Sequence, residues 1–254
     1  MDGIREEIQR KLDEIEEKEN VRILHCAESG SRAWGFASPD SDYDVRFIYI
    51  RKTEDYLRLC PLRDVIEWQL DDTFDINGWD IIKALRLLLK SNPTFFEWKN
   101  SPVVYRTCDE WQSAGDIFDE YFSLRSGVNH YLNTAKNNYK AYLQGESVKL
   151  KKYFYVLRPV LAAKWILDTK TPPPVLFYKL AQEELDSRIS REVEELLEMK
   201  KISSELGESS RIEKLHSYLE EEIASIEKSL TMLPHDSFAD TEKLDRLFRS
   251  FLEH

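Results

Sequence analysis

The sequence predicts an α+β protein, with a small mixed sheet and its helices first and a helical part second. Up to about residue 105, short runs rich in β-branched and aromatic residues alternate with helical patterns. Beyond that point, five segments repeat apolar residues at helical spacing: 109–145, 147–169, 175–206, 208–230 and 240–252. We therefore expect a first domain over residues 1–106 and a helical domain over residues 107–254.

Local patterns give the elements of the first domain in order. Residues 3–19 repeat isoleucine and leucine at helical spacing and predict an amphipathic helix. Four apolar runs predict strands: "VRILHCAE", "YDVRFIYI", "DVIEWQL" and "TFDING". The segment "WDIIKALRLLLKSNP" predicts a helix, with Asp80 as its N-terminal cap and Asn92-Pro93 at its end. In the second domain, "TKTPPPV" predicts a stiff break between helices.

Composition and charge narrow the possible functions. The chain of 254 residues has a net charge of -11, which disfavours non-specific binding to nucleic acid. Residues 125–170 nevertheless carry nine lysines and arginines against two acidic residues, which suits a nucleotide or a specific RNA end. The sequence has no apolar run that would span a membrane and no signal-peptide pattern. Its three cysteines are few and far apart and predict a reduced, cytoplasmic protein.

Two aspartates at the start of a predicted strand indicate a metal site. Asp42 and Asp44 are two residues apart, so a strand points both carboxylates to the same face. Two unpaired carboxylates would repel each other, and a divalent cation such as Mg²⁺ resolves that conflict. Upstream, Gly30 and Ser31 lie where a strand ends and a helix begins, a place where backbone N–H groups can meet a phosphate.

These residues resemble the signature of the polymerase-β-like nucleotidyltransferases, which is Gly-Ser, a spacer, then Asp-x-Asp leading into a strand. The words "ESGSRAWGF", "DINGWD", "KALRLLLKSNP" and "SPVVY" are similar to a narrower group, the RlaP (RNA-ligase-associated) predicted nucleotidyltransferases. The resemblance covers roughly residues 20 to 250. It implies a polymerase-β-like core, a reaction between an NTP and a hydroxyl acceptor, and a site with two divalent ions, Mg²⁺ or Mn²⁺.

The resemblance also implies a third carboxylate on a neighbouring strand. We choose Asp75, because it lies within a short apolar strand, so that Asp42, Asp44 and Asp75 form the predicted catalytic and metal-binding set. Three alternatives stay open at this point: Glu67, Asp71 and Asp80. A helix cap explains Asp80 more simply, and a turn explains Asp71 more simply.

A basic helix in the second domain supplies further candidates for nucleotide binding. Lys151, Tyr155 and Arg158 share one helix face, and related enzymes imply a role for such residues on the triphosphate. The alternative is a solvated face, or one that pairs with the acidic C-terminal region. His130, Asn133 and Asn137 form a polar stripe on another helix. We also assign three residues of the first domain to nucleotide binding: Gly30, Ser31 and Arg32.

The predicted function is transfer of a nucleoside monophosphate from an NTP to a hydroxyl, with release of pyrophosphate. The resemblance implies an RNA end as acceptor and an RNA ligase as associate, while a protein hydroxyl would also fit. One alternative is a catalytically silent partner that binds nucleotides or RNA ends in RNA repair. Another is a toxin-antitoxin component that attaches a nucleotide to a protein. No membrane partner is expected.

Overall fold

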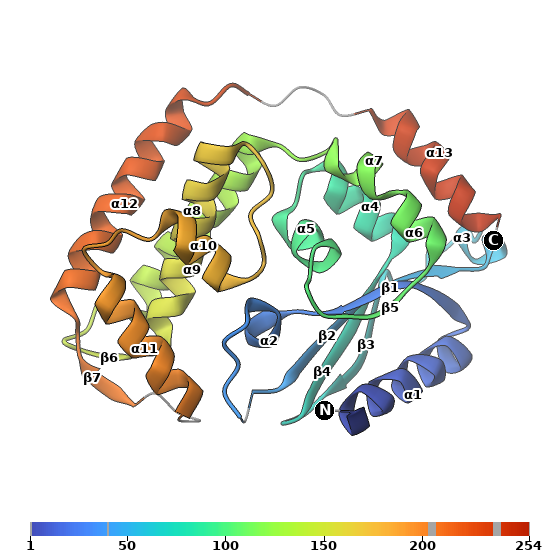
Figure 1. Cartoon of the computed structure of the whole chain (residues 1–254). Coiled ribbons are helices and arrows are strands. Elements are labelled where there is room, and N and C mark those ends of the chain that lie inside the picture. The colour runs from blue at the N-terminus through green and yellow to red at the C-terminus, as the bar shows by residue number, and fades with distance from the viewer. Residues whose placement is uncertain (1, 40, 203–206, 236–239, 254) are drawn as a thin grey trace. The chain divides into compact units, whose positions relative to one another are not determined.

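Residues 2–39, 41–202, 207–235 and 240–253 are described by a computed structural model, in which the chain forms two units (Figure 1). The first unit comprises Met1–Ala33, Asp42–Tyr121 and Phe238–His254, and the second comprises Trp34–Ser41 and Phe122–Ser237. The first unit therefore contains the sheet, and the second unit is mainly helical.

A five-stranded mixed sheet forms the centre of the first unit, in the order β3-β4-β2-β1-β5. The strands are β1 (Val21–Glu28), β2 (Tyr43–Arg51), β3 (Val65–Leu70), β4 (Phe74–Asp80) and β5 (Val104–Thr107). β2 and β4 are parallel, and the other neighbours are antiparallel. The four predicted strands are confirmed, whereas β5 is a short strand that the sequence pattern did not indicate.

Helix α1 (Asp2–Glu19) covers one face of this sheet (Figure 1). Its apolar stripe packs on alternate residues of β2, and the cluster includes Ile8, Leu12, Ile15, Val45, Phe47 and Tyr49. Successive residues of a strand point to opposite faces. The residues of β2 that alternate with these apolar ones, Asp44 before Val45 and Arg46 after it, therefore point to the face away from α1.

Most of the other helices of the first unit are short. These helices are α3 (Thr53–Tyr56), α4 (Ile81–Leu89), α5 (Pro93–Lys99), α6 (Asp109–Ser113), α7 (Gly115–Asp119) and α13 (Thr241–Leu252). The predicted cap is confirmed, because the Asp80 side chain accepts a hydrogen bond from the N–H of Ile82 at 2.9 Å. Asn92 and Pro93 follow α4 as expected, and they also begin α5, with Asn92 as its cap.

The two units differ from the predicted division at residues 106/107. The segment 109–145 is three helices and not one, and α6 packs against β1, with Trp111 stacked on His25 at a ring distance of 5.2 Å. At the other end of the chain, α13 packs on α4. Both ends of the predicted helical domain thus belong to the first unit, because their apolar side chains complete its core.

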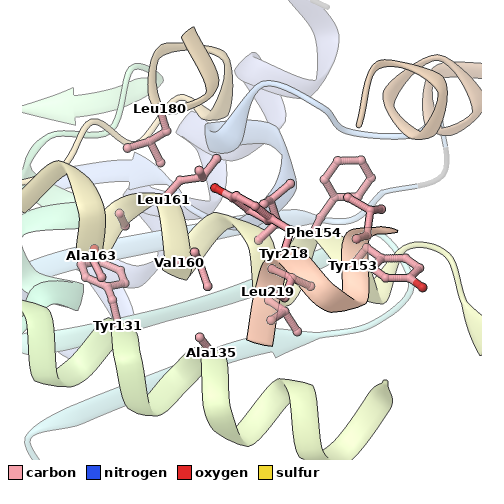
Figure 2. Close-up of a cluster of buried hydrophobic side chains, with 14 of the residues drawn as sticks. Tyr131, Ala135, Tyr153, Phe154, Val160, Leu161, Ala163, Leu180, Tyr218 and Leu219 are labelled. Carbon is pink, nitrogen blue, oxygen red and sulfur yellow. The ribbon is translucent and has the colours of Figure 1, made fainter. Parts of the chain in front are cut away.

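The second unit packs α8 (Leu124–Tyr142), α9 (Lys152–Thr169), α10 (Phe177–Glu184), α11 (Ser190–Ile202) and α12 (Glu213–Met232) around one apolar core, which Figure 2 shows. The predicted helices 147–169 and 208–230 each begin with a short strand, β6 (Ser147–Lys149) and β7 (Glu208–Ser210), and these strands pair. The predicted helix 175–206 is α10 and α11, and residues 203–206 lie outside the described residues. In the described part of the chain, no helix combines the length and hydropathy needed to cross a bilayer.

Candidate active site

Three aspartates lie where the two parallel strands begin. β2 and β4 pair in register, with Asp44 opposite Asp75. Side chains at directly paired positions project to the same face of a sheet, and Asp42 precedes Asp44 by two residues. The negative charges of Asp42 and Asp75 both act on Asp44. The register of the sheet thus places Asp44 and Asp75 on one face, and Asp42 directly precedes the start of β2.

The alternatives for the third carboxylate have structural roles elsewhere. Glu67 on β3 is exposed and forms an ion pair with Arg63 at 2.6 Å. Asp71 accepts hydrogen bonds from two backbone N–H groups of its own turn, each at 2.8 Å. Asp80, at the far end of β4, caps α4. Among these candidates, Asp75 is the one that the sheet places directly opposite Asp44.

Arg46 is a member of this cluster that the sequence analysis missed. It donates hydrogen bonds to Oδ1 of Asp44 at 2.9 Å and to Oδ2 of Asp75 at 2.6 Å. It also donates to the backbone oxygen of Asp75 at 2.6 Å. Asn77 lies opposite Arg46 in the register and donates to Oδ1 of Asp75 at 3.2 Å. The missed signal was the same two-residue alternation, since Arg46 follows Asp44 as Asp44 follows Asp42.

The electrostatics of Asp44 reflect this crowding. Burial raises the pKa of Asp44 above its ordinary value, and the charges of Asp42 and Asp75 act in the same direction. The guanidinium of Arg46 opposes these effects and favours the ionised form. A positive charge supplied by the chain itself therefore offsets part of the repulsion among the carboxylates.

Glu28, the last residue of β1, contacts the backbone of Asp44. Its Oε1 accepts a hydrogen bond from the backbone N–H of Asp44 at 2.8 Å, and its Oε2 accepts one from the hydroxyl of Tyr105. Burial raises the pKa of Glu28 to about 7. These hydrogen bonds fix the backbone from which the Asp44 carboxylate extends.

Gly30 begins α2 (Gly30–Trp34) in direct contact with Asp44. Its φ is +59°, a backbone conformation that glycine adopts more readily than other residues. A β-carbon at this position would overlap the carboxylate of Asp44, with Oδ2 as the nearest atom. The preceding Ser29 donates its backbone N–H to the carbonyl of Asp44 at 2.8 Å. The Gly-Ser turn and the aspartate strand are thus one joined unit.

Arg32 extends from the same short helix to the segment that carries Asp42. Its Nε donates to the backbone oxygen of Asp42 at 2.9 Å. Its guanidinium carbon lies 3.8 Å from the centre of the Tyr43 ring. Of the predicted nucleotide-binding residues, Gly30, Ser31 and Arg32 therefore belong to the turn beside the aspartates.

The other predicted nucleotide-binding residues lie in the second unit. Arg158 is buried, with its guanidinium carbon 4.6 Å from the centre of the Trp34 ring, and donates to the backbone oxygen of Val175 at 3.4 Å. Tyr155 meets the same tryptophan edge-on at 6.2 Å. Lys151 precedes α9 and is half-buried. Two of the three side chains thus contact Trp34, the last residue of α2, and their role in nucleotide binding stays a prediction.

A proline in α9 explains part of this arrangement. Pro159 has no N–H, so it leaves the carbonyl of Tyr155 without its helical donor. The side chain of Asn138 on α8 donates to that carbonyl at 2.9 Å. Asn138, which the sequence analysis did not select, therefore replaces the missing helical hydrogen bond next to the residues that contact Trp34.

The polar stripe predicted on α8 is only partly turned to solvent. Asn133 and Asn137 are exposed, and His130 is half-buried against the edge of the Tyr131 ring. On the same helix, Lys136 pairs with Glu227 of α12 at 2.9 Å. This ion pair joins α8 to α12 and leaves the predicted alternative for the Lys151, Tyr155 and Arg158 face untested.

The donor chemistry of the aspartate cluster fits a hard divalent cation, which takes oxygen ligands. Arg46 already engages Oδ1 of Asp44 and Oδ2 of Asp75, while Oδ2 of Asp44 faces the Gly30 turn and Asp42 is exposed. Within the described ranges, no group of three or more His, Cys, Asp or Glu side chains forms a ready metal cage. The cluster thus has suitable oxygens, with some of them held by an arginine.

Comparisons with known proteins match nearly the whole chain to one family. The model of a family described as "RlaP: RNA repair pathway DNA polymerase beta family" matches residues 4–250. The chain is 44% identical over 250 residues to the uncharacterized protein YcgL of Bacillus subtilis (strain 168), covering 96% of each chain. A solved nucleotidyltransferase-like protein from Exiguobacterium sibiricum 255-15 matches 90% of this chain and 75% of its own, at 12% identity and a TM-score of 0.31.

Proposed function

Because the chain belongs to the RlaP family, we propose that it is a nucleotidyltransferase that moves a nucleoside monophosphate from an NTP to a hydroxyl acceptor. The acceptor hydroxyl gives up its proton to solvent and its oxygen bonds to the α-phosphorus, the bond from that phosphorus to the bridging oxygen of the β-phosphate breaks, and pyrophosphate leaves with that oxygen. One observation supports the proposal most: parallel strands in register set Asp44 beside Asp75, with Asp42 two residues upstream and Gly30 packed on Asp44.

In this proposal Asp42, Asp44 and Asp75 hold the divalent ions, for which we expect two Mg²⁺ or Mn²⁺. Bound there, such ions supply positive charge for the α-phosphate and lower the pKa of the attacking hydroxyl. Glu28 keeps the backbone of Asp44 in place. Gly30 lets the Asp44 carboxylate pack directly against the turn, since it has no β-carbon. Ser31 and Arg32 then lie on the same turn to orient the nucleotide.

The description of the family supports an RNA end as the acceptor, because it names an RNA repair pathway. An RNA end needs only a small footprint, which suits a chain with a net charge of -11. A protein hydroxyl is the competing acceptor. A partner that binds nucleotides without transfer is the competing function, and the hold of Arg46 on Asp44 and Asp75 is the observation that favours it.

A labelling experiment tests the proposal. The full chain is incubated with Mg²⁺ or Mn²⁺ and each α-³²P-labelled NTP in turn, with total RNA or with lysate, and products are then treated with ribonuclease or protease. We expect a label that ribonuclease removes and protease does not. A label that protease removes would move the acceptor to a protein.

Two variants give this assay its controls. Asp42→Asn with Asp44→Asn removes the proposed ligands and is expected to abolish labelling. Glu67→Gln removes an exposed carboxylate of β3, one of the alternatives for the third ligand, and is expected to leave labelling unchanged. Absence of any label with all four NTPs, while nucleotide still binds, would favour the silent partner.

A further inference from the structure

Arg46 occupies a place in the carboxylate cluster that the strand register assigns to it. It lies on the same face of β2 as Asp44, and opposite Asn77 of β4. The side chain of Arg46 is only 13% exposed. Its guanidinium reaches one oxygen of Asp44 and one of Asp75, so it bridges the two strands at the site itself.

The contacts of Arg46 divide into two kinds. The hydrogen bonds to the carboxylates, at 2.9 Å and 2.6 Å, place a positive charge between Asp44 and Asp75. The bonds to the backbone oxygens of Val45 and Asp75, at 3.2 Å and 2.6 Å, hold the planar guanidinium in one orientation. Charge and orientation are separable, because a lysine keeps the first and loses most of the second.

A fixed cation in this place must affect how many divalent ions the cluster takes. Three carboxylates attract two doubly charged ions more strongly than three carboxylates neutralised in part by a guanidinium. Arg46 also occupies oxygens that an ion between Asp44 and Asp75 would need. The oxygens of Asp42 and the second oxygen of Asp44, beside Gly30, are outside these contacts.

We propose that Arg46 is a resident cation of the site that limits the nucleotide-free protein to one divalent ion, bound through Asp42 and Asp44. A second ion binds only when Arg46 releases Asp75, for instance when the triphosphate arrives with its own negative charge. Arg46 is thus a positioning residue, which acts through the carboxylates. This inference rests on the proposed function, because it takes Asp42, Asp44 and Asp75 as the ion ligands.

The test counts Mn²⁺ bound to the full chain without nucleotide, by electron paramagnetic resonance of the free ion. We expect one bound ion for the wild-type protein. Arg46→Met removes the charge at similar length, and we expect a second bound ion or an affinity about tenfold higher. Arg46→Lys keeps the charge and is expected to bind one ion. Arg51→Met, an arginine of the same strand that pairs with Glu19, is the matched control and is expected to match the wild-type protein.

Thermal unfolding separates this role from simple packing. Arg46→Met is expected to unfold at a lower temperature than the wild-type protein in a chelator, because the carboxylates lose their counter-charge. Added Mn²⁺ is expected to raise its unfolding temperature by more than it raises that of the wild-type protein. A residue that only packs would give the same Mn²⁺ shift in both proteins, and that result would overturn the inference.

The count on the wild-type protein keeps the inference testable if Arg46→Met does not fold. Two tightly bound ions in the wild-type protein would refute it and leave the proposed transfer intact. Binding of one ion by both the wild-type protein and Arg46→Met, with equal affinity, would also refute it. If no Mn²⁺ binds to either protein or to the NTP complex, the metal site itself fails, and the inference fails with it.

Discussion

The two units differ in how far their candidate polar side chains are exposed to solvent or engaged by other residues. In the first unit, Asp42 is exposed while Asp44 packs against the Gly30 turn, so the carboxylate of Asp42 is open to solvent. In the second unit, Arg158 is buried over Trp34 and Lys136 pairs with Glu227. The difference predicts a split: substitutions at the aspartate face cost activity, and substitutions inside the helical unit cost stability.

The largest effect is expected at the aspartates themselves. Asp42→Asn combined with Asp44→Asn should lower the transfer rate by at least about a hundredfold, because it removes charge that the reaction needs. Thermal unfolding in a chelator should be nearly unchanged, since Arg46 keeps its bond to Asp75. Labelling rates and calorimetry of the same preparation check both parts. Full activity in the double variant would remove the aspartates from the proposed mechanism.

The turn beside the aspartates should give the next largest effect. Gly30→Val places side-chain atoms against the Asp44 carboxylate and forces a branched residue to a φ of +59°, which costs about 1–3 kcal/mol. We expect it to abolish detectable binding of an NTP with Mg²⁺. Ser31→Ala removes one hydroxyl and keeps the backbone, so its affinity should fall less. If Ser31→Ala binds more weakly than Gly30→Val, the hydroxyl is the main contact and the turn is not.

The sequence could predict those features of the site that depend on neighbouring residues, and not those that depend on residues far apart in the chain. The strand alternation that unites Asp42 and Asp44 is local, and the same alternation would have found Arg46. Asp75 was selected on its apolar strand alone, because the pairing of β2 with β4 is a long-range property. The burial of Arg158 was not predictable, since helical spacing shows which residues share a face and not what covers that face.

The contact between Arg158 and Trp34 gives the third prediction. Arg158→Ala removes a buried side chain that packs on an aromatic ring, so it should destabilise the protein by about 1–3 kcal/mol. Lys151→Ala, at a half-buried residue that precedes α9, should change stability little.

Nucleotide titration of the same two variants sharpens the comparison. A direct phosphate contact by Lys151 would appear as a dissociation constant about tenfold higher or more in Lys151→Ala, measured with a non-hydrolysable NTP. A stability loss in Arg158→Ala with unchanged nucleotide affinity would assign Arg158 to packing. Lower affinity at unchanged stability would contradict the split between the two units.

The smallest effect concerns a buried carboxyl group of the second unit. Burial and the neighbouring charge of Asp168 raise the pKa of Glu184 to about 7, while Lys164 acts in the opposite direction. The folded protein therefore holds this proton more tightly than the unfolded chain does. The contribution of Glu184 to stability is therefore fully present below pH 4.5, the ordinary pKa of a glutamate. This contribution is lost as the pH rises to about 7, the pKa of Glu184 in the folded protein.

Glu184→Gln tests this linkage, because glutamine keeps the shape of the protonated acid and does not titrate. The unfolding free energy of the wild-type protein should fall more between pH 5 and pH 7 than that of the variant, as measured by urea denaturation at each pH. Asp186→Asn, at a carboxylate whose pKa is lowered by its hydrogen bonds with Arg188, is the matched control and should keep the wild-type slope over this range. Parallel curves for Glu184→Gln and the wild-type protein would show that Glu184 is ionised in the folded state over this pH range.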